Sequence, residues 1–193
     1  MKSFQLSAQV SSTNTVTKNI QSIDNLIEFI TNNDWCVGTF KPRDELSQLT
    51  ARESNRRNEF FISAPSIFAV DIDNTYTKTE QSYPELTGQE AGRRLDRIGL
   101  SYLIAPTKNN KIIKEGHEAA GPVERFRVLL FLSRSITSYE DYKRVFKYVK
   151  QEIFPEMDRQ CSDPARFYSR SSSVTFGAVF FADLVVDVCF TVQ

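Results

Sequence analysis

The sequence predicts an α+β domain in which helices flank a mixed or antiparallel sheet. Two observations carry this prediction. Apolar residues recur at steps of three and four in one long segment, as on one face of a helix; they are Tyr139, Tyr142, Phe146, Val149 and Ile153. Short apolar runs bounded by turn residues occur on both sides of that segment and are typical of strands. The hairpin-like spacing of the later runs favours antiparallel pairing.

Helix and strand are expected to alternate along the first half of the chain. Ser22 can cap a helix running to about Asn32, because its hydroxyl can accept a hydrogen bond from a free amide of the first turn. Further on, the pattern predicts a strand over residues 35–40, a polar loop over 41–58, a strand over 60–73 that Pro65 interrupts, and a helix over 84–98 that Gly99 ends.

The second half continues in the same manner. The pattern predicts a strand over 101–105, a polar loop over 108–121 that holds the only histidine, His117, a strand over 125–132, the long helix that begins at Tyr139 and ends before Pro155, and strands over 165–169 and 176–192. The segment 1–19 is polar and rich in Ser and Thr, so it is expected to be poorly ordered. Residues 20–193 are then expected to form a single domain. The chain is expected to be a fragment of a longer protein.

Composition narrows the setting of the protein. The chain has 193 residues, of which 40% are hydrophobic, and no apolar stretch long enough to span a bilayer, so no membrane partner is expected. The three cysteines, Cys36, Cys161 and Cys189, are odd in number and lack zinc spacing, which favours a reducing compartment and a cytoplasmic location.

Charge is balanced overall but unevenly distributed. Residues 87–150 hold 13 Lys and Arg against 7 Asp and Glu, and the segments on either side are each net acidic by three. A basic centre beside acidic residues suits a polyanionic ligand, although a solvated helix face explains the same pattern.

Asp71 and Asp73 are the most informative residues of the chain. They end the apolar run Ile67-Phe-Ala-Val-Asp-Ile-Asp73, and alternate residues of a strand share one face. Two carboxylates on one face repel each other unless a cation or a proton relieves the repulsion. The pair is therefore a candidate metal site for phosphoryl or nucleotidyl transfer, and two solvated acids at a turn are the plain alternative.

Four segments together resemble the catalytic core of the archaeo-eukaryotic primase superfamily, most closely the primase-polymerases of plasmids, phages and other mobile elements. In chain order they are Val70-Asp-Ile-Asp73, Ala105-Pro-Thr-Lys-Asn-Asn-Lys111, Glu124-Arg-Phe-Arg-Val-Leu-Leu-Phe-Leu132, and Asp158 followed by Cys161-Ser-Asp-Pro-Ala-Arg-Phe-Tyr168. The resemblance implies a primase-polymerase (RRM-like) core, template-directed nucleotidyl transfer, a single-stranded DNA template, NTP or dNTP as substrate, and a replicative helicase domain or protein as a further partner.

The resemblance also implies roles for individual residues. Asp71, Asp73 and Asp158 resemble the three acidic ligands of the catalytic Mg²⁺ or Mn²⁺ ions. Arg166 resembles the family arginine that follows the third ligand and contacts phosphate or base. Strand alternation places Arg125 and Arg127 on one face, so Arg127 is expected to face the same site. The nucleotide-binding turn is expected to comprise Thr107, Lys108, Asn109, Asn110 and Lys111.

The second motif departs from the family pattern, which ends in Ser-x-His or Ser-His. Either Asn110 replaces that histidine or His117 serves from a longer loop, and the sequence leaves both open. Asn can donate a hydrogen bond to phosphate but carries no charge, which Lys108 and Lys111 are expected to supply.

Two other functions fit parts of the sequence. Val70-Asp-Ile-Asp-Asn-Thr75 also resembles the opening motif of haloacid-dehalogenase-like phosphatases, with Asp71 as nucleophile and Asp73 as general acid/base; Asp183, Asp187 and Lys147 or Lys150 would complete that site. Alternatively, the chain is a non-catalytic module that binds single-stranded nucleic acid, with bases stacked on aromatic residues; the candidates are Tyr139, Tyr142, Phe167 and Tyr168.

Overall fold

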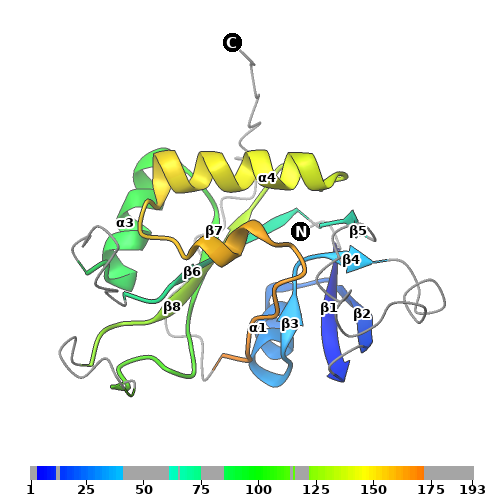
Figure 1. The fold of residues 1–193 in the computed structure, drawn as a ribbon, viewed down its shortest axis with the longest axis horizontal. Coiled ribbons are helices and arrows are strands. Elements are labelled where there is room, and N and C mark those ends of the chain that lie inside the picture. Colours follow the sequence, from blue (N-terminus) through cyan, green and yellow to red (C-terminus); the bar gives the residue numbers. More distant parts are fainter. Residues whose placement is uncertain are drawn as a thin grey trace, which may run out of the picture.

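A three-stranded antiparallel sheet forms the centre of the molecule (Figure 1). The computed structural model describes residues 4–11, 14–40, 61–64, 66–74, 85–113, 115 and 122–171. The strands are β6 (Ile67–Ile72), β7 (Tyr102–Pro106) and β8 (Phe126–Phe131), with β8 in the middle. Helices accompany this sheet, so the predicted α+β class with an antiparallel sheet is confirmed.

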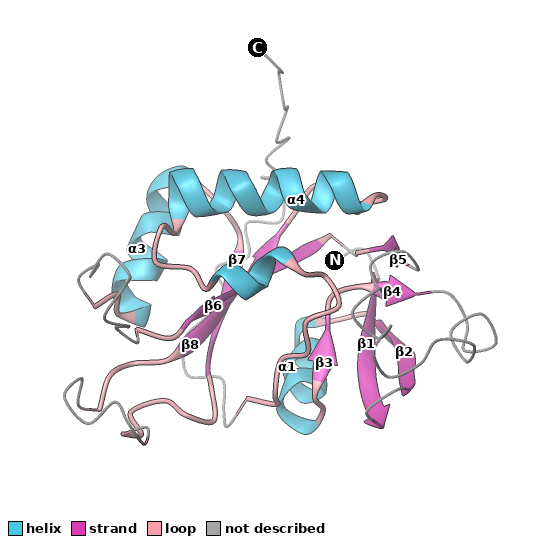
Figure 2. Cartoon of the chain, viewed as in Figure 1, coloured by secondary structure: helices cyan, strands magenta, loops and turns pink. Residues whose placement is uncertain are grey.

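Two helices pack on one face of the sheet (Figure 2): one follows β6 in the sequence and the other follows β8. α3 (Gly88–Ile98) begins at the Thr87 cap and ends at Gly99, whose φ of 69° suits glycine. α4 (Tyr139–Tyr148) begins at the Ser138 cap and continues as the π-helical turn Val149–Ile153. The ring of Phe68 lies 5.2 Å from that of Tyr142, so α4 packs on the face formed by Phe68, Val70 and Ile72. Ile98, at the C-terminal end of α3, is half exposed.

Asp71 lies on the other face of the sheet, because alternate residues of a strand point to opposite faces. Arg127 of β8 is paired with Asp71 in register and lies on the same face. β6 is an edge strand, and the chain after α4 covers its edge, including the 3₁₀ helix η4 (Arg159–Ser162). The Asp158 amide donates to the Asp71 carbonyl at 3.0 Å, and the Asp71 amide donates to Cys161 Sγ at 3.3 Å. These bonds satisfy an edge that would otherwise be open, and they bring Asp158 beside Asp71.

The N-terminal segment corrects a prediction. Residues 1–19 were expected to be poorly ordered, but β1 (Phe4–Ser11) and β2 (Asn14–Ile20) pair as a hairpin, and β3 (Trp35–Cys36) adds to β1. The alternation of Phe4, Leu6, Ala8 and Val10 with polar residues was the missed signal. α1 (Ile23–Asn32) follows the hairpin and begins at Ser22, as predicted.

The predicted strand 35–40 is divided. Its first part is β3, and its second part is β4 (Thr39–Phe40), which pairs with β5 (Phe61–Ser63). The predicted strand 165–169 is reduced to one bridge between Tyr168 and Trp35. The predictions for residues 41–58 and 176–192 lie outside the described residues. Among the helices that are described, none is both long and apolar enough to cross a bilayer.

Candidate functional site

A polar cavity of about 260 Å³ opens beside the end of β6 and the start of β8. Segments far apart in the sequence meet there: the end of β6, the turn after β7, strand β8 and the chain on both sides of η4. The lining residues are Asp71, Asp73, Thr107, Asn109, Arg127, Asp158, Arg166, Phe167 and Ser169. The structure thus brings together all three acids and both arginines of the predicted site, with part of its predicted turn.

Asp71 is largely buried and lies between two arginines. Arg127 Nε is 3.2 Å from its Oδ1, and Arg166 Nη2 is 2.8 Å from its Oδ2. Burial raises the pKa of Asp71, whereas the positive charges of Arg127 and Arg166 oppose that rise. The neighbouring carboxylates of Asp158 and Asp73 raise the pKa further. The acids of this cavity are therefore close enough to interact electrostatically.

Arg166 bridges two of these acids. Its Nη1 lies 2.9 Å from Asp158 Oδ2, while Nη2 contacts Asp71. The other Asp158 oxygen, Oδ1, accepts from the Gln160 amide at 2.9 Å and caps η4, so the backbone fixes this carboxylate. Burial alone lowers the pKa of Arg166, but the charges around it, those of Asp71 and Asp158 among them, raise it above its ordinary value. The guanidinium therefore stays charged.

Arg125 is a site residue that the sequence reasoning did not include among its candidates. It is almost completely buried, and its Nε lies 2.9 Å from Asp73 Oδ1. Its Nη1 donates to the carbonyls of Asn109 and Ile112 at 3.0 and 2.5 Å. Arg125 thus joins Asp73 to the turn after β7. The alternation of Arg125 and Arg127 was the available signal, and each arginine does reach one aspartate of the pair.

The turn after β7 presents Asn109, rather than Asn110, to the cavity. The Thr107 amide donates to the Arg125 carbonyl at 2.9 Å, and the Asn109 amide to Thr107 Oγ1 at 3.3 Å. The Asn110 Oδ1 accepts from the Arg125 amide at 2.9 Å, so its side chain supports the turn. Asn109 therefore lines the cavity, and Asn110 supports the turn behind it.

The other predicted members of the turn lie away from the cavity lining. Lys108 is exposed, and Lys111 Nζ is 3.6 Å from Glu124 Oε1. His117 lies outside the described residues. The prediction for His117 therefore remains untested. Asn110 has a structural role, because its side chain accepts a hydrogen bond from the Arg125 amide.

Ser169 is a second residue that the sequence analysis missed. Its carbonyl accepts from Arg127 Nη1, and its Oγ lies 3.2 Å from Arg127 Nη2. The guanidiniums of Arg127 and Arg166 lie 5.2 and 5.6 Å from the centre of the Tyr168 ring. These contacts are cation–π interactions between the ring and the two guanidiniums. No local sequence pattern marks Ser169, because its partner lies 42 residues away.

The fit of a divalent cation depends on the arginines. In the part of the chain that the structure describes, no group of three or more His, Cys, Asp or Glu side chains is gathered closely enough to form a ready cluster. However, Oδ2 of Asp71 and Oδ2 of Asp158 both face the position that the Arg166 guanidinium takes. Carboxylate oxygens are the ligands that Mg²⁺ and Mn²⁺ prefer. A cation shared by Asp71 and Asp158 would therefore use oxygens that Arg166 now contacts.

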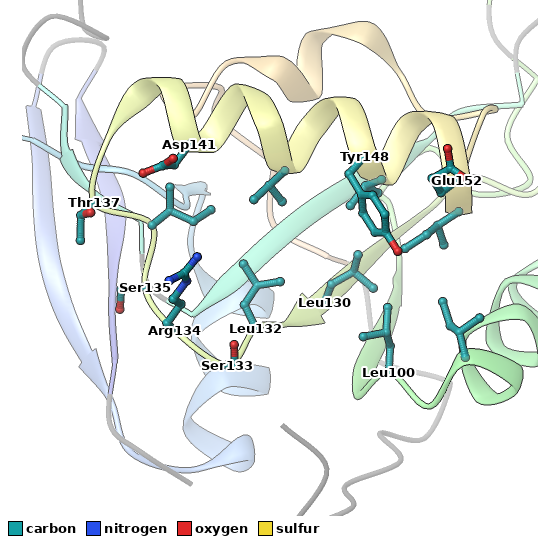
Figure 3. Close-up of a pocket in the computed structure, with 15 residues that line it drawn as sticks. Leu100, Leu130, Leu132, Ser133, Arg134, Ser135, Thr137, Asp141, Tyr148 and Glu152 are labelled. Carbon is teal, nitrogen blue, oxygen red and sulfur yellow. The ribbon is translucent and has the colours of Figure 1, made fainter. Parts of the chain in front are cut away.

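A larger cavity of about 710 Å³ lies between α4 and the other face of the sheet (Figure 3). Leu100, Leu130 and Leu132 line it from the sheet side, Tyr148 lines it from α4, and Glu152 from the π-helical turn that follows. Its walls are mainly apolar, and the acids and arginines described above are not among its lining residues. The larger cavity therefore lacks the acids and arginines of the predicted site, and the smaller polar cavity is the candidate functional site.

Comparisons of the chain with protein-family models, with curated proteins and with solved structures found no match. Function must therefore be argued from the geometry. The phosphatase alternative needs a parallel βαβ sheet, whereas β6, β8 and β7 are antiparallel. Its candidate Lys150 donates to the carbonyls of Pro155 and Met157, and Lys147 is exposed. Asp183 and Asp187 lie outside the described residues.

The structure also bears on the base-stacking alternative. Tyr142 and Tyr168 are fully buried, so neither ring offers a face to a base. Phe167 and Tyr139 are partly exposed, and Phe167 lines the polar cavity. A stacking surface would therefore rest mainly on Phe167, beside the acids and arginines.

Proposed function

We propose that this chain is a primase-polymerase catalytic domain that performs template-directed nucleotidyl transfer from NTP or dNTP on single-stranded DNA. One observation carries the proposal. Three acids from two distant segments and two arginines line one cavity together with the Thr107–Asn109 turn. The chain order β6, α3, β7, β8, α4 supports the RRM-like core that the sequence resemblance implies. A replicative helicase, as a domain or a separate protein, remains the expected partner.

Each residue would have a separate task at this site. Asp71, Asp73 and Asp158 would hold Mg²⁺ or Mn²⁺ through carboxylate oxygens. The ions, when bound, lower the pKa of a hydroxyl nucleophile and stabilise the leaving pyrophosphate. Arg127 and Arg166 would donate charge-assisted hydrogen bonds to phosphate oxygens. The Thr107 hydroxyl and the Asn109 amide group would donate neutral ones.

Primer extension tests the proposal directly. The full chain, a primed single-stranded DNA template and labelled NTP or dNTP are incubated with Mg²⁺ or Mn²⁺, and a parallel reaction contains EDTA. Extension is expected only with the metal. Asp71→Asn and Asp73→Asn are each expected to lower it by about a thousandfold, as happens when catalytic groups act as a unit.

Asp24→Asn is the matched control, because Asp24 is an exposed acid in the first turn of α1. This variant is expected to extend primers at the wild-type rate. Circular dichroism should show that all three variants are folded. Full activity in a folded Asp71→Asn or Asp73→Asn protein would contradict the assignment of these carboxylates to the metals.

A further inference from the structure

Arg166 occupies the position between two carboxylates that the proposed function assigns to a cation. Its two terminal nitrogens contact Asp71 Oδ2 at 2.8 Å and Asp158 Oδ2 at 2.9 Å. A cation shared by these carboxylates would need the same two oxygen atoms. Cation binding and the present position of Arg166 therefore compete for these two oxygens.

Arg166 is also the least anchored of the site arginines within the described part of the chain. Main-chain carbonyls hold the other two: Ser169 accepts from Arg127, and Asn109 and Ile112 accept from Arg125. The contacts of Arg166 are instead the two carboxylates and the Tyr168 ring. This guanidinium can therefore move without breaking the turn or the sheet.

The charges at the site explain when it would move. Asp71, Asp73 and Asp158 are paired with Arg127, Arg125 and Arg166, so the formal charges of these side chains cancel. A cation that binds alone would leave Arg166 unpaired where its side chain is only 17% exposed, which is costly. A triphosphate that drew Arg166 to itself without a cation would leave Asp71 and Asp158 without that positive charge. When both bind, the cation takes the carboxylates and the phosphates take Arg166.

We propose, resting on the function proposed above, that Arg166 couples the binding of the metal ion to that of the triphosphate. Each ligand then binds weakly alone and strengthens the other to the same extent, since coupling between two binding sites is reciprocal. A coupling of about tenfold or more is expected. Arg166 is thus a switch between a closed carboxylate pair and a bound nucleotide.

Calorimetry of the full chain tests this coupling without turnover. Three titrations are made, with Ca²⁺ alone, with dATP in EDTA, and with dATP in saturating Ca²⁺; Ca²⁺ is chosen as a hard cation for oxygen ligands. The wild type is expected to bind dATP about tenfold more tightly with Ca²⁺ than in EDTA. Arg166→Gln is expected to bind Ca²⁺ alone about tenfold more tightly than the wild type, because its competitor is gone.

Two further variants complete the design. Arg170→Gln removes the same charge from an exposed neighbour and is expected to retain the wild-type affinities. Arg166→Lys keeps the charge but lacks the planar fork that bridges two carboxylates. It is expected to bind Ca²⁺ alone more tightly as well, and it replaces Arg166→Gln if circular dichroism shows that the latter is unfolded.

The outcomes separate this inference from the function on which it rests. Unchanged Ca²⁺ affinity in the Arg166 variants, with Ca²⁺-dependent dATP binding and primer extension intact, would overturn the coupling and leave the function standing. A folded wild-type protein that binds neither Ca²⁺ nor dATP would overturn both.

Discussion

Each acid that lines the candidate site has an arginine partner. A neighbouring side chain also accepts a hydrogen bond from the main chain of Asp71. The Asp71 amide points away from β8 and donates to Cys161 Sγ, a weak acceptor. Burial raises the pKa of the Cys161 thiol to about 12. The thiol therefore keeps its proton at every pH at which the protein is expected to work. Its role is structural: it is buried in the core and accepts the hydrogen bond from the Asp71 amide.

Cys161 is expected to resist alkylation in the folded protein at about pH 8, because only the thiolate reacts and that form is negligible well below the raised pKa. After unfolding, the pKa returns to its ordinary range and the same thiol is expected to react. Mass spectrometry of peptides after iodoacetamide treatment measures both states. Fast labelling of Cys161 in the folded protein would contradict its buried position.

The elements around the site are joined by one asparagine. Asn74 follows β6 with a φ of 48°, in the left-handed region that Asn tolerates better than most residues. Its Nδ2 donates to the carbonyls of Leu86 and Glu124 at 2.8 and 2.7 Å, and its Oδ1 accepts from the Leu86 amide at 3.0 Å. Asn74 thereby links the end of β6 to the approaches of α3 and β8.

Asn74→Ala is expected to destabilise the protein by about 2–3 kcal/mol, because it removes partners from buried backbone groups. Asn74→Gly loses the same hydrogen bonds but accepts the positive φ, so it is expected to cost about 1 kcal/mol less. Urea denaturation of both variants measures the difference. Equal stability of the two variants would show that the backbone conformation contributes nothing, and wild-type stability in both would contradict the role of the hydrogen bonds.

The molecule as a whole places the N-terminal part against the site. Trp35 and Tyr168 exchange backbone hydrogen bonds of 2.9 and 2.7 Å, and their ring centres lie 4.9 Å apart. The Ser171 amide donates to the Ile30 carbonyl, and the Arg170 amide to Asp34 Oδ1. α1 and β3 therefore hold the segment that carries Arg166, Phe167 and Ser169, although they contribute no lining residue themselves.

Trp35→Ala is expected to cost about 3–5 kcal/mol, as for other large buried aromatic residues. Because its partner Tyr168 lies between Phe167 and Ser169, this variant is also expected to weaken dATP binding under conditions in which it stays folded. Phe29→Ala is the control, because it also truncates a buried aromatic residue but lies in α1 rather than beside Tyr168. It is expected to lower the stability without a specific effect on dATP binding. Equal loss of dATP binding in both variants would contradict a specific link between Trp35 and the site.

Local patterns were sufficient for most helices and strands. Caps at Ser22 and the glycine at position 99 act within a few residues, so α1 and the end of α3 follow from the sequence. The run from Ile67 likewise predicted a strand that ends at an acidic pair. The hairpin at the N-terminus was missed because the many Ser, Thr, Gln and Asn residues of this segment outweighed the alternation of Phe4, Leu6, Ala8 and Val10. The π turn after α4 was also missed, since tertiary contacts decide how a helix ends.

Periodicity and capping are properties of neighbouring residues, so the α+β class, the central strands and the acids that end β6 could be predicted from the sequence. Which arginine meets which acid depends instead on the tertiary arrangement. Arg166 and Asp71 are 95 residues apart, and Arg125 and Asn109 are 16 apart. Such contacts depend on how strands and loops are stacked, and no local spacing encodes that arrangement. The choice of Asn109 over Asn110 for the cavity has the same cause, since the buried Arg125 sets the orientation of the turn.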